Sequence, residues 1–95
     1  MSAPEPILVV DDEPDVANAL GDFLVGEGFA VVVAHTGKEA VARLHEGGVG
    51  LVLLDLVLPD MDGVAVMREA RSVANAPEIV IVTGHATLET AIAAG

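Results

Sequence analysis

The chain has 95 residues, of which 53% are hydrophobic and 20% charged, a balance that supports one small folded core and excludes a disordered segment. Fifteen acidic residues against four basic ones give a formal charge of −11, which disfavours direct contact with nucleic acid or with an anionic membrane. The chain has no cysteine, so disulfides and thiolate metal sites are excluded. It shows no signal peptide and no apolar stretch long enough to span a bilayer, so we expect a cytoplasmic protein.

Short apolar runs alternate with helical patterns along the chain. We predict strands over residues 7–10, 29–34, 51–54 and 79–82, and helices that begin near Pro14, Thr36, Val64 and Thr87. Runs that are apolar throughout are typical of strands buried on both faces. Strands that alternate with helices form a parallel sheet with helices on both sides, so the sequence predicts a single α/β domain over residues 1–95.

Two of the predicted helices carry more specific signals. The first has an apolar stripe that we expect to face the core, formed by Val16, Leu20, Phe23 and Leu24. The second begins at Thr36, and Glu39 follows three residues later, the spacing of a capping box.

Polar side chains follow three of the predicted strands directly. Asp11 and Asp12 follow the first strand, Asp55 follows the third, and Thr83 follows the fourth. Sites in parallel sheets lie beyond the carboxyl ends of the strands, so these residues converge if the three strands are neighbours. Any one of these acids alone would be more typical of a solvated helix cap. Because clustered carboxylates repel one another and Mg²⁺ relieves that repulsion, the three acids together predict a magnesium-assisted phosphate site.

The position of Asp55 at the end of a leucine-rich strand suggests a chemical role. A carboxylate there can attack phosphorus as a nucleophile and form an acyl phosphate. The Thr83 hydroxyl, one strand further, could donate a hydrogen bond to a new phosphoryl oxygen, although a strand-end or capping role explains it equally well.

Three stretches carry a family resemblance, namely ILVVDDEP at residues 7–14, LLDLVLPDMDG at residues 53–63 and IVTG at residues 81–84. In order and spacing they resemble the receiver domain of bacterial two-component response regulators, and the resemblance covers essentially the whole chain. It implies a doubly wound parallel sheet of the flavodoxin-like receiver fold with strand order 2-1-3-4. In that family a fifth strand and helix follow, so the resemblance implies a C-terminally truncated, incomplete receiver domain.

The resemblance also implies roles for individual residues. Asp55 would be the phosphoacceptor, phosphorylated by a histidine kinase or phosphotransfer protein, and it would join a Mg²⁺ site. Asp12 would bind the ion directly, Asp11 through water, and Val57 through its backbone carbonyl. Thr83 would be the switch hydroxyl that moves onto the phosphoryl group.

Three further positions match the family's loop pattern. Pro59 and Gly63 would shape the loop after the acceptor, and Gly84 would leave room beside the phosphoryl group. In this family a lysine pairs with the phosphoryl group. It would belong to the absent unit, because Lys38 is the only lysine here and lies in the capping box of the second helix. Val57 cannot orient a water by hydrogen bonding, so we expect slow dephosphorylation.

The fourth strand, residues 79–82, would be an exposed apolar edge without the absent unit. Such an edge pairs readily with another chain, so we expect either self-association through it or marginal stability.

Two alternative functions remain open beside a receiver that catalyses only its own phosphorylation and dephosphorylation. One is a Mg²⁺-dependent phosphohydrolase with Asp55 as a transient nucleophile, which is disfavoured because Val57 stands where a second acid would be expected. The other is a receiver-like protein-interaction module that is not phosphorylated.

Overall fold

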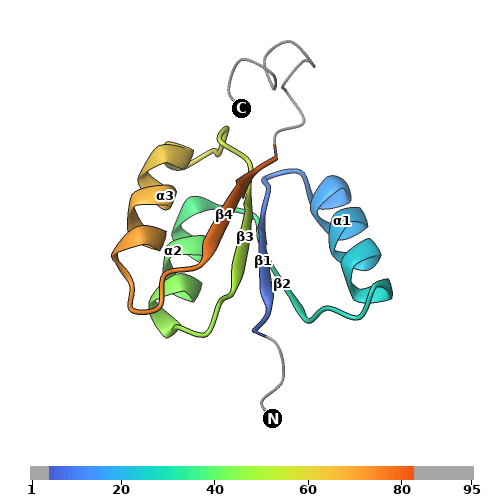
Figure 1. The fold of residues 1–95 in the computed structure, drawn as a ribbon. Helices are drawn as coiled ribbons and strands as arrows, with labels where there is room; N and C mark the ends of the chain where they lie inside the picture. The colour runs from blue at the N-terminus through green and yellow to red at the C-terminus, as the bar shows by residue number, and fades with distance from the viewer. Residues whose placement is uncertain (1–4, 83–95) are drawn as a thin grey trace.

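The computed structural model describes residues 5–82, which form a parallel sheet with helices on both faces (Figure 1). The strands are β1 (Ile7–Val10), β2 (Val31–Ala34), β3 (Leu51–Leu54) and β4 (Glu78–Ile81). The helices are α1 (Pro14–Gly26), α2 (Gly37–Glu46) and α3 (Gly63–Ser72). The helix predicted near Thr87 lies outside the described residues. Helix α1 covers one face of the sheet, and α2 and α3 lie side by side on the other.

The strand order is β2-β1-β3-β4 and every pairing is parallel, which confirms the predicted fold class. The register aligns Val10 of β1 with Leu54 of β3, so the two strands end at the same level. The Asp55 N–H donates to the Val10 carbonyl at 2.9 Å, and the ladder continues as the Val82 N–H donates to the Leu54 carbonyl at 2.9 Å. The residues that directly follow β1, β3 and β4 therefore lie at the same edge of the sheet.

The second strand is shorter than predicted and begins at Val31. Residues 27–29 complete the end of α1 instead of pairing with β1. The Phe29 N–H donates to the Leu24 carbonyl at 3.1 Å, and Gly28 adopts a positive φ of 98°, which glycine adopts without strain. The Phe29 side chain is exposed as a result.

The predicted inner face of α1 is wrong at two positions. Val16 and Phe23 are exposed, Phe23 to 63%, whereas Ala17 and Gly21 are buried.

The reason is the short distance between α1 and β2. A Cβ at Gly21 would already touch Val31 and Val33 at 3.5 Å, so the helix lies too close to β2 for large side chains along that line. The face that packs on the sheet therefore combines two small residues with two half-buried leucines, Leu20 and Leu24.

The larger part of the core lies between the sheet and the pair α2–α3. Its members are buried side chains from both layers: Leu8, Val10, Ala34, Ala40, Leu44, Val49, Val52, Leu54, Val66 and Ala70. The smaller cluster under α1 has only Ile7, Val9 and Ala17 fully buried. Strand β1 is buried at all four positions, as expected for a strand covered on both faces.

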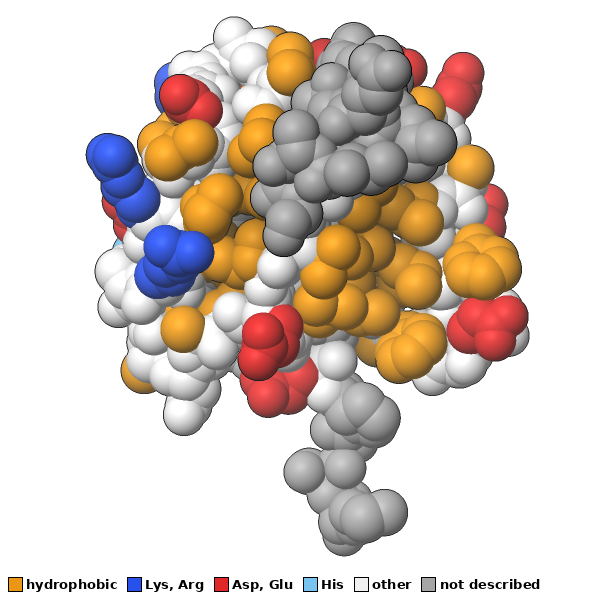
Figure 2. Space-filling view, turned by 45° about the horizontal axis from the view of Figure 1, so that its top comes forward, with side chains coloured by type: hydrophobic (Ala, Val, Ile, Leu, Met, Phe, Trp, Pro, Cys, Tyr) orange, Lys and Arg blue, Asp and Glu red, His pale blue; other side chains and the backbone are white. Residues whose placement is uncertain are grey.

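Strand β4 lies at the end of the sheet within residues 5–82 and is far less covered than β1. Val80, Ile81 and Val82 are 46%, 41% and 39% exposed. Figure 2 shows hydrophobic side chains gathered over much of this side of the molecule. The predicted apolar edge is therefore present in the described part of the chain. Within the same residues, no helix has the length and apolar character needed to cross a membrane.

Candidate functional site

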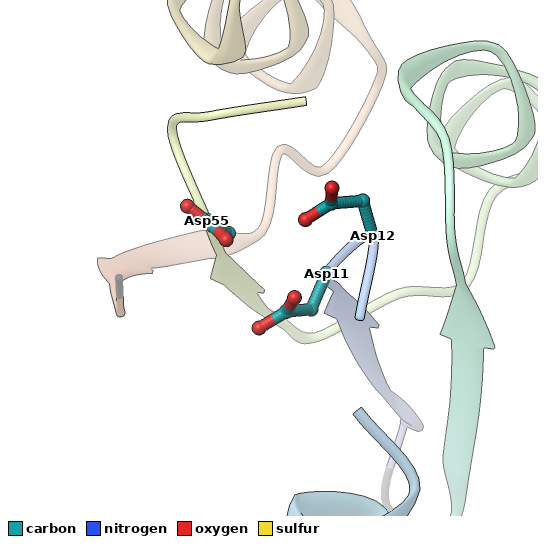
Figure 3. A group of neighbouring side chains, drawn as sticks. All are labelled: Asp11, Asp12 and Asp55. Atoms are coloured by element: carbon teal, nitrogen blue, oxygen red, sulfur yellow. The ribbon is translucent and has the colours of Figure 1, made fainter. Parts of the chain in front are cut away.

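Three carboxylates meet at the shared end of β1 and β3. Asp11 and Asp12 extend from the end of β1 toward Asp55 at the end of β3 (Figure 3). One oxygen of each residue lies within 4.8 Å of one from each of the others. Because β1 and β3 are adjacent and in register, residues more than forty positions apart in the chain converge, as expected if these strands are neighbours.

The cluster is partly removed from solvent. Asp55 is 2% exposed and Asp11 is 6% exposed. The Val57 N–H donates to Asp55 Oδ1 at 3.0 Å, and the Glu13 N–H donates to Asp11 Oδ1 at 2.9 Å. Each of these two carboxylates is thus oriented by a backbone amide two residues further along the chain.

Asp12 differs from its two neighbours because its Oδ1 is buried and accepts no hydrogen bond in the described part of the protein. A buried acceptor without a partner costs free energy, and more so when the group is charged. No lysine or arginine among residues 5–82 pairs with the three carboxylates, since the ion pair found there joins His45 and Glu69. A cation would satisfy the orphaned oxygen and offset the repulsion among the acids.

The donor set fits Mg²⁺ on chemical grounds. This ion is hard, prefers oxygen ligands, and binds through one or two carboxylates while keeping several waters and a phosphate oxygen. Asp11, Asp12 and Asp55 offer only oxygen atoms, and cysteine is absent from the chain. The orphaned oxygen of Asp12 supports the same fit.

The loop from Leu56 to Asp62 joins Asp55 to α3 and is closed at its base. Val57 and Asp62 form an isolated antiparallel bridge, and the Gly63 N–H donates to the Leu56 carbonyl at 3.2 Å. A Cβ at Gly63 would lie 2.6 Å from the Leu56 Cα, so only glycine permits this approach. Val57 is 53% exposed, and its backbone N–H contacts Asp55.

Of the other predicted site positions, Pro59 is described by the structure and two more are not. Pro59 lies in the same loop and is exposed. Thr83 and Gly84, which follow β4, lie outside the described residues. Lys38 is placed in the first turn of α2, as its sequence position indicated.

Two residues with contacts that concern the site segments were not among the predicted site residues: Asp60, in the loop after Asp55, and His35, which contacts Asp11. Asp60 accepts hydrogen bonds from the Gly37 N–H at 2.8 Å and the Lys38 N–H at 2.9 Å. These bonds, the one from Gly37 first, hold the pKa of the Asp60 carboxyl below its usual value. His35 Nδ1 donates to the Asp11 carbonyl at 3.1 Å. No sequence signal marks these contacts, because they join segments 22 to 24 residues apart through backbone groups.

The fold and the acidic edge define a class of signalling domain, and sequence comparison identifies it. Residues 7–95 match the sequence model of the response regulator receiver domain. The chain belongs to the receiver domain family of response regulators, the signalling domains of two-component systems, which are not enzymes in the conventional sense.

Known relatives support this membership. The transcriptional regulatory protein GlrR of Escherichia coli K12 is 36% identical over 91 residues, which are 96% of this chain and 20% of GlrR. The chain thus spans about a fifth of the length of that relative. Among solved structures, the response regulator TrrA of Thermotoga maritima in complex with Mg²⁺-BeF is 34% identical with a TM-score of 0.79, over 86% of this chain and 71% of TrrA.

A second structure of TrrA shows it bound to the histidine kinase ThkA. The matched chain of this complex is 33% identical to the present chain with a TM-score of 0.78, and the match covers 88% of the present chain and 72% of the matched chain. The fold, the strand order and the family assignment therefore agree with the expectation from the sequence motifs.

Proposed function

We propose that this receiver domain accepts a phosphoryl group on Asp55 from a histidine kinase or a phosphotransfer protein, with Mg²⁺ in the acidic site. The observation that carries the proposal is the meeting of a buried Asp55 with Asp11 and with the orphaned oxygen of Asp12. The complexes of TrrA with a histidine kinase and with Mg²⁺-BeF support it by similarity.

In this proposal Asp55 is the nucleophile. The Val57 N–H holds Oδ1, which orients the carboxylate and leaves Oδ2 to attack phosphorus. The new bond joins Oδ2 to phosphorus, and the bond between phosphorus and the donor nitrogen breaks. Burial at the strand end keeps the carboxylate in one orientation, which lowers the entropic cost of reaching the reactive geometry.

The three acids and the backbone of the loop after Asp55 would hold the metal. Asp12 and Asp55 would bind Mg²⁺ directly, Asp11 through water, and Val57 through its carbonyl. When bound, Mg²⁺ neutralises charge on the transferring phosphoryl oxygens. Thr83 would then donate its hydroxyl to the phosphoryl group, Gly84 would leave space for it, and Pro59 and Gly63 would shape the loop.

The direct test is the intact mass of the chain after incubation with acetyl phosphate, with and without Mg²⁺. We expect one phosphoryl adduct that requires Mg²⁺ and is absent from Asp55→Asn. Asp12→Asn removes the negative charge of the side chain whose Oδ1 has no protein partner, and should lower the yield at limiting Mg²⁺. An adduct of equal yield on Asp55→Asn would refute the assignment of the acceptor.

We also propose a second copy of the chain as a partner at the β4 edge. Within residues 5–82 this strand pairs on one side only, and Val80 and Ile81 are exposed. Sedimentation velocity should show association that increases with concentration and that Val80→Lys weakens, because a charged side chain blocks edge pairing. Val25→Lys on α1, at a side chain 58% exposed, is the control and should leave association unchanged. A parent chain that stays monomeric would contradict this proposal.

A further inference from the structure

Asp60 connects two segments that are distant in the sequence, the loop after Asp55 and the start of α2. It lies at the tip of the loop that follows Asp55, and both of its carboxylate oxygens are used at the start of α2. Oδ1 accepts from the Gly37 N–H at 2.8 Å, and Oδ2 accepts from the Lys38 N–H at 2.9 Å. The two short bonds attach the loop tip to the first two residues of α2, which lie 23 and 22 positions earlier in the chain.

The contact is more than a general helix cap. Thr36 is the residue that caps α2 locally, because its hydroxyl oxygen accepts from the Glu39 N–H at 3.1 Å. The Ala40 N–H donates to the Thr36 carbonyl at 3.1 Å. The two remaining amides of the first turn, those of Gly37 and Lys38, receive their acceptors from Asp60. The loop therefore supplies what the local sequence of α2 leaves unsatisfied.

Shape complements these hydrogen bonds. A Cβ at Gly37 would overlap the Met61 side chain and would come within 3.2 Å of Asp60 Oδ1. The glycine thus lets the loop tip rest directly on the helix backbone. The positive end of the α2 dipole also favours a carboxylate at this place, consistent with the lowered pKa of Asp60.

The base of the same loop carries the atoms that orient the acceptor. The Val57 N–H holds Asp55 Oδ1 at 3.0 Å, and Val57 and Asp62 form the bridge across the base. Between them the chain runs out through Asp60 and back. The attachment of the tip to α2 and of the base to the start of α3 restrains the Val57 backbone relative to Asp55.

We infer that Asp60 is a positioning residue for phosphoryl transfer, which acts by holding the loop against α2 so that the Val57 backbone keeps its place beside Asp55. This inference rests on the proposed function, since it concerns the same site. Asp60 does not itself touch the acceptor; it acts through Val57. Release of the tip should misplace both the amide that orients Asp55 and the carbonyl proposed as a metal ligand. A misplacement of about 1 Å can cost up to about a hundredfold in rate, so a measurable loss is expected.

The two hydrogen bonds from Gly37 and Lys38 to Asp60 form the Asp60 clamp. The test uses variants that separate the effect of this clamp from the stability of α2. Asp60→Ala removes both acceptors, and Asp60→Asn keeps one acceptor oxygen. Gly37→Ala keeps the carboxylate but pushes the loop away from the helix. Thr36→Ala is the matched control, because it removes the local cap of the same helix turn without touching the loop.

Two quantities are measured for each variant: the rate of phosphorylation by acetyl phosphate, followed by intact mass, and the Mg²⁺ concentration that gives half the maximal rate. Mass is the suitable readout because the chain has no tryptophan or tyrosine to report on the site. We expect Asp60→Ala and Gly37→Ala to slow the reaction about tenfold and to raise the Mg²⁺ requirement. Asp60→Asn should lie between them and the parent. Thr36→Ala should lower the melting temperature but leave both kinetic quantities near those of the parent.

The outcomes distinguish a failure of the proposed phosphoacceptor function from a failure of the positioning role of Asp60. If the parent accepts no phosphoryl group, the proposed function fails and this inference with it. If the parent is phosphorylated and Asp60→Ala matches its rate and Mg²⁺ requirement, the positioning role alone is refuted. Equal losses in Asp60→Ala and Thr36→Ala would also refute it, because they would show that only the stability of α2 matters. Should Asp60→Ala fail to fold by circular dichroism, Asp60→Asn and Gly37→Ala decide the same question.

Discussion

The two faces of the sheet differ in how they are covered. On the α2–α3 face, large aliphatic side chains such as Leu44 and Leu54 are fully buried, and the loop after Asp55 is tied to both helices. On the α1 face, the helix packs through Ala17 and Gly21, and Phe23 is left exposed. The difference shows that the loop after Asp55 takes its position from the well-packed face, whereas on the other face apolar side chains of α1 such as Phe23 stay exposed.

The largest expected effect tests the packing difference. Leu44→Ala on α2 removes a side chain that is 1% exposed and should lower the free energy of unfolding by about 2 to 5 kcal/mol. Leu24→Ala on α1 removes a half-buried side chain and should cost about 1 to 2 kcal/mol. Urea denaturation followed by far-ultraviolet circular dichroism measures both. Equal losses would show that the two faces contribute alike.

The next effect concerns the close approach at the base of the loop. Gly63→Ala places a Cβ 2.6 Å from the Leu56 Cα, where only backbone movement can relieve the overlap, and should cost about 1 to 3 kcal/mol. Gly26→Ala at the end of α1 meets no atom within 4 Å and is the matched control. Its melting temperature should equal or exceed that of the parent. A tolerated Gly63→Ala would mean that the loop base is not rigid.

A third effect concerns the lifetime of the phosphorylated form. Val57 is exposed two residues after Asp55, and its side chain offers no hydrogen bond to a water. We expect Val57→Asn to speed the loss of the phosphoryl group about tenfold by orienting the attacking water. The adduct is followed by intact mass after acetyl phosphate is removed, with Val25→Asn on α1 as the control. Identical lifetimes for Val57→Asn and the parent would rule out this role of the side chain.

The smallest expected effect is a pH dependence from the clamp. The hydrogen bonds from Gly37 and Lys38 lower the pKa of Asp60 in the folded protein from its ordinary value of 3.8. The stabilisation is therefore fully present above pH 3.8 and is lost as pH falls through the lower folded-state value. Asp60→Asn lacks this contribution, so its stability difference from the parent should shrink with acidification. If the stability difference between Asp60→Asn and the parent stays constant from neutral to acidic pH, the stabilisation does not depend on an ionised Asp60.

The acidic site could be predicted because strand order alone brings it together. The alternation of strands and helices predicts a parallel sheet, and the family resemblance supplies the order in which β1 and β3 are neighbours. With that order, the residues that follow the two strands share an edge, where Asp11 and Asp55 meet. The capping residue of α2 was also predictable, because Thr36 and Glu39 are close in the chain. There the Glu39 carboxylate accepts from the His35 N–H at 3.2 Å, one residue before the position that a capping box uses.

Other features could not be predicted because they depend on tertiary packing. Hydrophobic periodicity selected Val16 and Phe23 for the inner face of α1, but the close approach to β2 favours Ala17 and Gly21. The clamp by Asp60 uses backbone amides, which every residue type except proline provides, so no residue pattern indicates it.

The most direct measurement locates the phosphoryl group in the chain. The protein is incubated with Mg²⁺ and acetyl phosphate, the acyl phosphate is reduced with borohydride, and the peptides are analysed by mass spectrometry. We predict that the reduced residue is Asp55 and that Asp11 and Asp12 remain unmodified. Modification at another carboxylate, or an unmodified Asp55 in a chain that carries the phosphoryl adduct, would contradict the assignment of Asp55 as the phosphoacceptor.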